Sequence, residues 1–133
     1  MASVELRNEV LFRAPTRIGL LADVTAALHD AGVNILAIGA YDKGDQGEFL
    51  MITSNNRATG DALAPLGGEI DIAPVVVAEV PNVPGELAVI ARRIADAGFN
   101  ISQIHATATD SATAMIVLRT EHEAQVVDLL KDL

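Results

Sequence analysis

The sequence has no cysteine and very few aromatic residues. Without cysteine the chain cannot form disulfides, thiolate metal sites or cysteine nucleophiles, so redox chemistry does not fix its compartment. Aromatic residues make up only 3% of the 133 residues, so Ala, Val, Ile and Leu must build the core. The same scarcity argues against aromatic cages and against surfaces that stack on nucleic-acid bases.

Long apolar runs and excess basic charge are lacking as well. No uninterrupted apolar run approaches the roughly 18 to 20 residues of a membrane-spanning helix. The first ten residues, MASVELRNEV, carry charge by residue five and lack the apolar stretch of a secretion signal. We therefore expect a cytoplasmic protein. A formal net charge of −9 repels nucleic acid and anionic membranes at long range, so neither is expected as a partner.

What the sequence does contain is an internal repeat. A shift of 66 positions without gaps aligns APTRIGLLADVTAALHDAGVNI (14–35) with VPNVPGELAVIARRIADAGFNI (80–101). The identities are Pro15 with Pro81, Gly19 with Gly85, Leu21 with Leu87, Asp30-Ala31-Gly32 with Asp96-Ala97-Gly98, Asn34-Ile35 with Asn100-Ile101, Ile38 with Ile104, Ala58 with Ala124 and Leu63 with Leu129. Because one offset holds through helix, turn and strand, we interpret the chain as a duplicated module, with copies at 1–73 and 74–133.

Each copy is expected to contain strand, helix, strand, strand and helix. Both predicted first helices have apolar residues at helical spacing, and Gly32 and Gly98 follow them where a left-handed C-terminal cap is expected. Thr120-Glu121-His122-Glu123 has the pattern of a capping box. The expected elements are strands at 4–13, 34–41 and 48–53 with helices at 18–31 and 57–65, then strands at 75–80, 100–107 and 113–119 with helices at 84–97 and 121–132, and a turn, ATDS, at 108–111.

The sequence predicts an α+β fold of two ferredoxin-like modules, each an antiparallel sheet with helices on one face. EIDI, at 69–72, supplies a fourth strand for the first module, but the second module has none of its own. Its open edge must be covered by the N-terminal segment, by the stretch 69–80 or by another subunit, because so small a half is not robust alone. We therefore expect shared strands or a homodimer.

The segment 80–86, VPNVPGE, ends a strand and begins a helix in the second copy. Pro84 suits the first helical turn, and Gly85 lets a ligand or another backbone come close. The free N–H groups of a helix start can bind a small carboxylate, and Asn82 adds a donor and an acceptor. Such a site could bind both the carboxylate and the ammonium group of a free amino acid. The alternative is that Asn82 only caps the helix and Asn100 only tolerates its place after a glycine.

The succession of strand, N-x-P-G turn, apolar helix, D-A-G-F-N-I and strand resembles the ACT domain, a small βαββαβ regulatory module that binds amino acids. The whole chain is similar to stand-alone tandem ACT proteins and to the regulatory part of aspartokinases. The likeness covers nearly the full length and is stronger in the second copy. It implies a non-enzymatic regulatory protein with a small amino acid as its ligand.

The resemblance also implies ligand-binding positions. In the ACT domain of phosphoglycerate dehydrogenase, serine is held by an Asn three residues before the loop glycine and by another at the start of the second strand. Those positions fall on Asn82 and Asn100, and on Thr16 and Asn34 in the first copy. That domain also uses a His where this sequence has Val80, so serine itself is not implied.

Two loop-and-strand segments are therefore expected to form the ligand sites. Their residues are Asn82, Val83, Pro84, Gly85, Glu86, Asn100 and Ile101 in the second copy, and Thr16, Arg17, Ile18, Gly19, Asn34 and Ile35 in the first. If only one copy binds, the second loop is favoured, with the Asn34 strand of the first copy facing it.

Other residue patterns in the sequence give weaker indications of function. His29, His105 and His122 lack partners at metal-ligand spacing, so no metal is expected, although His105 lies in a strand beside the second loop. DKGDQGE (42–48) predicts a hairpin turn in preference to a cation loop. No nucleophile elbow, paired carboxylates or phosphate-cradling loop is present, so neither catalytic residues nor a cofactor is expected.

Three functions remain to be compared. The leading hypothesis is a regulatory protein that binds an amino acid where modules meet and thereby controls a partner enzyme or transporter. The second is a ligand-free assembly module that pairs with a partner protein through its sheets. The third is a ferredoxin-like RNA binder, but the central strands FLMITS and AMIVLR lack the paired aromatics of such modules.

Overall fold

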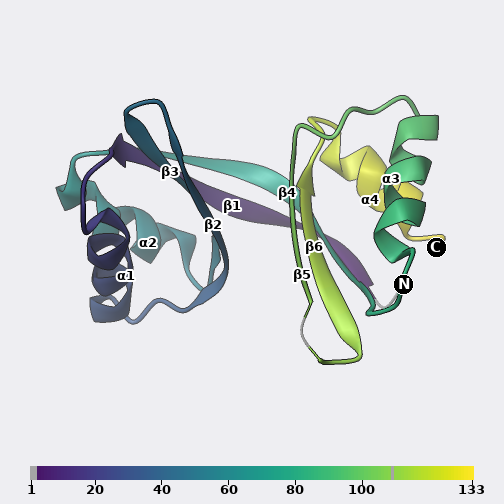
Figure 1. Cartoon of the computed structure of the whole chain (residues 1–133), viewed down its shortest axis with the longest axis horizontal. Helices are drawn as coiled ribbons and strands as arrows, with labels where there is room; N and C mark the ends of the chain where they lie inside the picture. Colours follow the sequence, from purple (N-terminus) through teal and green to yellow (C-terminus); the bar gives the residue numbers. More distant parts are fainter. Residues whose placement is uncertain (1–2, 109) are drawn as a thin grey trace. The chain divides into compact units, whose positions relative to one another are not determined.

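The computed structural model describes residues 3–108 and 110–133 (Figure 1). The elements are β1 (Ser3–Pro15), α1 (Leu20–Asp30), β2 (Ile35–Lys43), β3 (Gln46–Thr53), α2 (Asn56–Leu63), a 3₁₀ turn (Ala64–Leu66), β4 (Glu69–Pro81), α3 (Glu86–Asp96), β5 (Gln103–Ala108), β6 (Thr113–Arg119) and α4 (Glu123–Leu130). The hydrogen-bonded strand order is β2-β3-β1-β4-β6-β5.

The predicted turn at 108–111 includes residue 109, which lies outside the described residues. No helix among the described residues is both long and apolar enough to span a bilayer.

The predicted duplication is confirmed element by element. β1 and β4 begin at residues 3 and 69, and α1 and α3 begin at residues 20 and 86, which keeps the shift of 66. From β3 and β6 onward the shift is 67, because Glu48 and Met115 are equivalent residues. Glu48 pairs with Arg13 and Tyr41 in the first module. Met115 pairs with their equivalents, Glu79 and Thr107, in the second. The β5–β6 hairpin is thus one residue longer. The predicted alignments of Ala58 with Ala124 and of Leu63 with Leu129 are therefore wrong by one. Leu130 is fully buried, as Leu63 is, whereas Leu129 is only partly buried.

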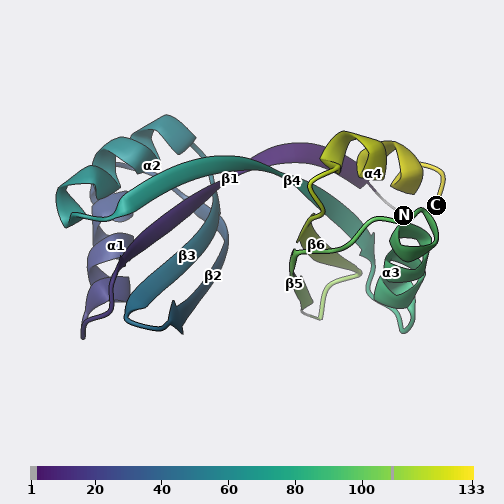
Figure 2. The same ribbon diagram turned by 90° about the horizontal axis from the view of Figure 1, so that it is seen from above.

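The first module comprises residues 8–73. Its sheet runs β2-β3-β1 and ends on the first residues of β4, and α1 and α2 cover one face of it (Figure 2). Alternate strand residues turn to that face, as a period of two requires. Its buried core is Val10, Phe12, Ala14, Leu20, Val24, Leu28, Val33, Phe49, Met51 and Leu63. Each fully buried large apolar side chain contributes about 1.5–3 kcal/mol.

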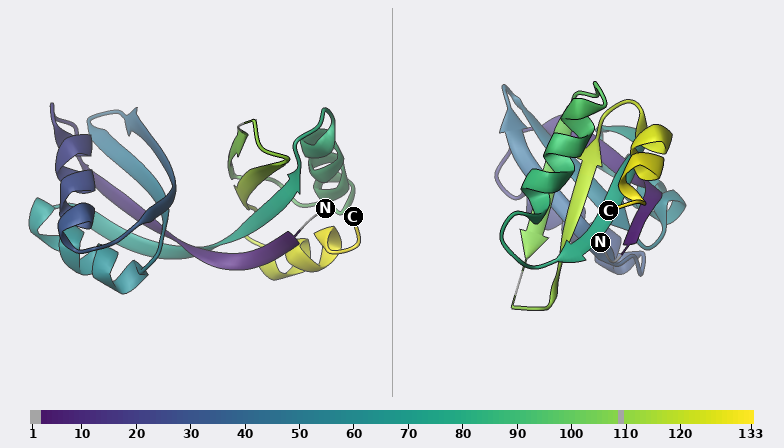
Figure 3. Two further views of the ribbon diagram at one scale, coloured as in Figure 1. Left: turned by 90° about the horizontal axis from the view of Figure 1, so that it is seen from below. Right: turned by 90° about the vertical axis from the view of Figure 1, so that its right-hand side faces the viewer.

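The second module comprises the described residues 3–7 together with 74–133. Its sheet contains the first residues of β1, then β4, β6 and β5, and α3 and α4 cover one face of it (Figure 3). Its buried core is Val76, Ala78, Val80, Ile90, Ile94, Ile116, Leu118, Val126, Val127 and Leu130. Val4 packs against this core from β1.

The first residues of β1 therefore supply the strand that the second module lacks. Residues 3–7 group with the second module, whereas the rest of β1 belongs to the first. β4 does the same in reverse, since 69–73 complete the first module and 74–81 open the second. Among the described residues, the predicted modules 1–73 and 74–133 differ from these compact units only in the placement of residues 3–7. Among the three sources considered, the N-terminal segment covers the edge.

Several local predictions need adjustment. α1 and α3 begin two residues later than expected, after Gly19 and Gly85, whose φ angles of 88° and 96° are left-handed. Pro84 therefore precedes α3 and does not lie in its first turn. Gly32 and Gly98 adopt the predicted left-handed conformation, with φ angles of 71° and 88°.

The predicted capping box at the start of α4 forms, but one of its hydrogen bonds differs from the expected pattern. The Glu123 carboxylate accepts hydrogen bonds from the Thr120 and Glu121 N–H groups at 2.7 and 3.0 Å. The Thr120 hydroxyl accepts from the N–H of His122, at 3.1 Å, one residue earlier in the chain than the capping box requires. His122 is accordingly the N-cap, and the helix begins at Glu123.

Candidate functional site

A cavity of about 360 Å³ lies at the start of α1 in the first module, and we call it the α1 cavity. Its lining residues come from the β1–α1 loop, the first turn of α1, and β2 and β3 where they approach their hairpin. They are Thr16, Arg17, Gly19, Leu20, Leu21, Ala40, Tyr41, Asp42, Gly47 and Phe49. The volume is within the range of roughly 300 to 1,000 Å³ found for small-molecule pockets.

Backbone geometry shapes the loop side of the α1 cavity. Gly19 is the N-cap residue of α1 and has no side chain to cap the free N–H groups of the first turn. The Thr16 N–H donates to the Asp45 carbonyl at 2.8 Å, which fixes the loop against the β2–β3 hairpin. Gly47 is close to α1, because a Cβ atom there would lie 2.9 Å from the Leu20 Cδ2 atom. Loop, helix start and hairpin are thereby held together.

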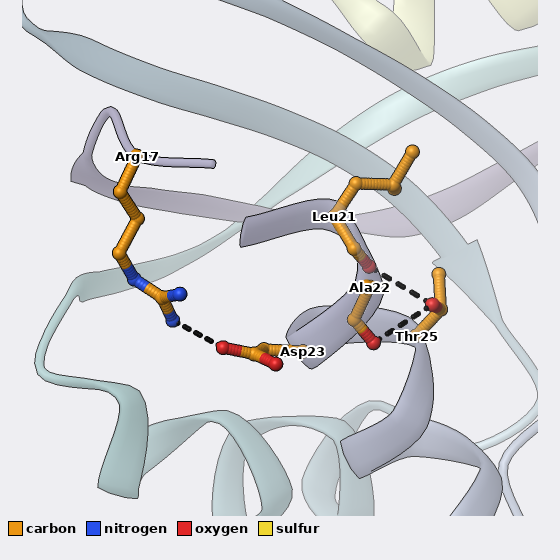
Figure 4. Close-up of polar contacts among 5 residues, drawn as sticks. All are labelled: Arg17, Leu21, Ala22, Asp23 and Thr25. Atoms are coloured by element: carbon orange, nitrogen blue, oxygen red, sulfur yellow. Dashed lines mark hydrogen bonds and ion pairs between the residues drawn. The ribbon is translucent and has the colours of Figure 1, made fainter. Parts of the chain in front are cut away.

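Charged side chains on two elements give the cavity its electrostatic character. The Arg17 guanidinium donates to the Asp23 carboxylate at 2.6 Å, while Thr25 bonds back to the Leu21 and Ala22 carbonyls (Figure 4). Arg17 and Asp23 remain 47% and 50% exposed, so guanidinium N–H groups stay accessible. On the β2 side, the Asp42 carboxylate accepts from the Thr16 hydroxyl at 3.3 Å.

This pair of opposite charges is specific to the first module. The residues equivalent to Arg17 and Asp42 in the second module are Val83 and Ala108, as the strand register and the shift of 66 show. The two modules thus share a backbone plan but differ in the chemistry at the start of their first helix.

The opposite face of the same sheet carries a row of polar side chains, which we call the Tyr41 row: Tyr41, Glu48, Arg13 and Asp71. The cross-strand pairs Tyr41↔Glu48 and Arg13↔Glu48 place three of them side by side. Arg13 lies 3.9 Å from Glu48 and 3.4 Å from Asp71. The hydrogen bond to Glu48, with partial burial and the negative charge of that carboxylate, raises the pKa of Tyr41 above 10.0, and Arg13 opposes the shift.

Some of the predicted first-copy residues meet at the cavity and others do not. Thr16, Arg17 and Gly19 line it, whereas the Ile18 side chain is fully exposed. Asn34 and Ile35 lie at the other end of β2, since Ile35 pairs with Thr53 while Asp42 pairs with Gly47 beside the cavity. The Asn34 N–H instead donates to the Ser54 hydroxyl at 2.9 Å. Within one module, loop and strand start therefore do not form a common site.

The second-copy residues divide in the same way. The Asn82 side chain donates to the Ser111 carbonyl at 3.1 Å, which ties its loop to the β5–β6 hairpin, and the N-cap residue of α3 is Gly85. Val83 and Gly85 are exposed, and Glu86 is the first residue of α3. Asn100 and Ile101 precede the end of β5 that pairs with Arg119, whereas Asn82 lies beside the opposite end of β6.

Sequence reasoning missed the β2 and β3 side of the α1 cavity, chiefly Asp42 and Gly47. Asp42 was noticed only as part of the DKGDQGE turn. The repeat gave no signal for it, because the second copy has Ala108 in its place.

Comparison with known proteins gives a consistent picture. The family model of the ACT domain matches residues 8–64 and 75–133. None of the curated proteins matches the sequence well enough to count as a relative.

Similar solved structures share the fold. The protein BT0572 from Bacteroides thetaiotaomicron is 24% identical with a TM-score of 0.88, over 97% of this chain and 89% of its own. The ligand-free regulatory subunit of aspartate kinase from Thermus thermophilus is 19% identical with a TM-score of 0.72, and that from Thermus flavus is 21% identical with a TM-score of 0.65; each comparison covers 98% of this chain and 96% of the other. With both modules matched by the family model, the chain belongs to the ACT domain family, as a tandem pair of these regulatory modules.

Proposed function

We propose that this chain is a regulatory protein that binds a small free amino acid in the α1 cavity. The observation that supports this most directly is the meeting of a cation, Arg17, and an anion, Asp42, on the lining of one cavity at a helix start. ACT domains as a family are regulatory, amino-acid-binding modules, and the similar Thermus structures are regulatory subunits of aspartate kinase.

The carboxylate end of an amino acid suits the loop side. Asp23 holds the Arg17 guanidinium at 2.6 Å through one of its nitrogens, leaving further N–H donors for a ligand. The first-turn N–H groups of α1, uncapped by Gly19, add the positive end of the helix dipole. A carboxylate here gains both a salt bridge and backbone hydrogen bonds.

The ammonium end suits Asp42, which lines the cavity from β2. Its carboxylate already accepts one hydrogen bond from Thr16, so its orientation is fixed and its remaining lone pairs are available. Leu20, Leu21 and Phe49 give the rest of the lining an apolar character that can contact a ligand side chain.

The second loop stays a further candidate for the same class of ligand. Its Asn82 and Gly85 repeat the first loop, but Val83 and Ala108 replace the charged pair. We therefore place the principal site in the first module and assign to Asn82 at most an auxiliary role. Binding that favours one packing of the modules would let the protein control a partner enzyme or transporter, by differential affinity.

Isothermal calorimetry with each common amino acid tests this proposal. We expect at least one to bind, and Asp42→Asn and Arg17→Gln each to weaken it about tenfold or more, since each removes a charge-assisted hydrogen bond worth roughly 1.5–3 kcal/mol. Asn82→Ala is the matched control and should bind with nearly unchanged affinity. Tyr41 is the single tyrosine of a chain without tryptophan, so its fluorescence reports on the first module alone.

The competing function is a ligand-free assembly module. It is favoured by the exposed apolar side chains Leu36 and Ile38 on the edge strand β2. If no amino acid produces heat of binding, stabilises the protein or changes Tyr41 fluorescence, the amino-acid proposal is wrong and the assembly function is preferred.

A further inference from the structure

The second module has a hollow of about 350 Å³ that lies away from its helix start, and we call it the sheet hollow. Its lining residues come from β1, β4, β5 and β6 and all belong to the second module. They are Ser3, Glu5, Arg7, Val77, Glu79, Thr107, Thr113, Ala114 and Met115. Glu79, Met115 and Thr107 are cross-strand partners and so share one face, opposite the buried row of Ala78 and Ile116.

The sheet hollow corresponds to the Tyr41 row of the first module. Under the structural equivalence of the two copies, Thr107 replaces Tyr41 and Met115 replaces Glu48. Glu79 replaces Arg13, and Glu5 replaces Asp71. Where the first module fills its sheet face with a phenol, a carboxylate and a guanidinium, the second has smaller or uncharged side chains, and a space remains.

The charges around that space are unbalanced. In the first module the Arg13 guanidinium lies 3.9 Å from Glu48 and 3.4 Å from Asp71. In the second, Glu5 has Arg7 at 3.9 Å, but the Glu79 carboxylate has no ion-pair or hydrogen-bonding partner within residues 3–108 and 110–133. The hollow thus has one carboxylate in excess at the position where the first module has its internal cation.

We propose that the sheet hollow is a second binding site, for a small ligand with an alkylammonium or alkylguanidinium group. The cationic group lies against Glu79 and Glu5, in the place equivalent to the Arg13 guanidinium. The Val77 and Met115 side chains contact the alkyl stem. A ligand of this kind needs no carboxylate, so the site is independent of the α1 cavity and of the function proposed for it.

The affinity of such a site is expected to be modest. Glu5 is 60% exposed and lies on the rim, so solvent screens its attraction for a cation. An exposed ion pair contributes little, so together with the apolar contacts we expect a dissociation constant on the order of millimolar or weaker. A method that detects weak binding at a named residue is therefore required.

Nuclear magnetic resonance of methionine methyl groups meets that requirement. The chain has 3 methionines, among which Met115 lines the hollow and Met51 lies in the core of the first module. Titration with 1,4-diaminobutane should shift the Met115 signal saturably and leave Met51 unchanged. The isosteric neutral 1,4-butanediol should shift neither signal.

Variants separate the site from general attraction of cations to an acidic protein. Glu79→Gln should weaken binding about three- to fivefold, and Thr107→Tyr, which restores the bulk of the first module, should abolish the Met115 shift. The control Glu69→Gln removes an exposed charge of β4 in the first module and should leave the affinity unchanged. Equal weakening by both glutamine variants, equal shifts with the diol, or a Met115 shift that never saturates would each overturn the proposal. None of these outcomes bears on amino-acid binding at Arg17 and Asp42.

Discussion

At the scale of single residues, the two modules differ most in where charge lies. The same backbone positions hold Arg17 and Asp42 in one module and Val83 and Ala108 in the other. On the opposite sheet face, Arg13 in one module stands where Glu79 stands in the other. A duplicated fold thereby presents two different chemical surfaces, because solvent-exposed positions tolerate such exchanges while core positions do not.

The Tyr41 row predicts a measurable titration. Because the hydrogen bond to Glu48 raises the pKa of Tyr41, its phenol should ionise above pH 10.0 when followed by ultraviolet absorbance. Glu48→Gln should bring the midpoint down, and Glu79→Gln, an equal charge change in the other module, should not. A raised pKa favours the folded state below the unfolded value, and this contribution is lost as pH rises through the folded value. A midpoint indifferent to Glu48→Gln would show that the hydrogen bond does not form.

At the scale of elements, left-handed glycines determine where the helices begin and end. Gly19 and Gly85 precede α1 and α3, and Gly32 and Gly98 follow them. No heavy atom lies within 4 Å of a Cβ atom built on Gly19, so backbone strain alone requires glycine there. Any other residue at position 19 would strain the β1–α1 turn, which shapes the α1 cavity.

A pair of glycine substitutions isolates that strain. Gly19→Ala should destabilise the protein by about 1–2 kcal/mol, because an L-residue resists a φ of 88°. Gly60→Ala adds the same methyl group, also into open space, inside α2 and should stabilise by roughly 0.5–1 kcal/mol. Urea denaturation measures both midpoints. If both variants shifted the urea midpoint in the same direction, the left-handed conformation of Gly19 would not explain the effect of its substitution.

At the scale of the whole molecule, β1 and β4 each take part in both modules. Residues 3–7 complete the second module, and 69–73 complete the first. Neither module has a full sheet without a segment from the other copy. We therefore expect the chain to unfold in one cooperative transition, with calorimetric and van't Hoff enthalpies in agreement.

Truncation tests this sharing directly. Removal of residues 1–7 should expose β4 of the second module and lower the hydrogen-exchange protection of 76–81, because an edge strand loses its partner. β3 lies in the first module and should keep its protection, which makes it the internal control. Equal loss in both modules would instead indicate global unfolding, and no loss in 76–81 would show that another segment covers the edge.

The sequence by itself determined the tandem repeat, the order of strands and helices, and the glycine-bounded turns. These depend on local terms, since apolar spacing and left-handed glycines act within a few residues of chain. The ACT family was predictable from the same pattern. Three residues that the sequence predicts at a ligand site, Thr16, Arg17 and Gly19, line the α1 cavity, but ligand binding there stays a prediction.

Only the tertiary structure decided which segment completes the second sheet, where the repeat slips by one residue, and that Asp42 and Arg17 line the same cavity. It also separated Asn34 and Asn100 from the loops of their own modules. Each of these depends on pairing between distant segments, whose free energy is a small difference between closure entropy and contacts made across the sheet. A local sequence pattern does not report that free-energy difference. The sequence alone could therefore name candidate segments for pairing, but it could not choose among them.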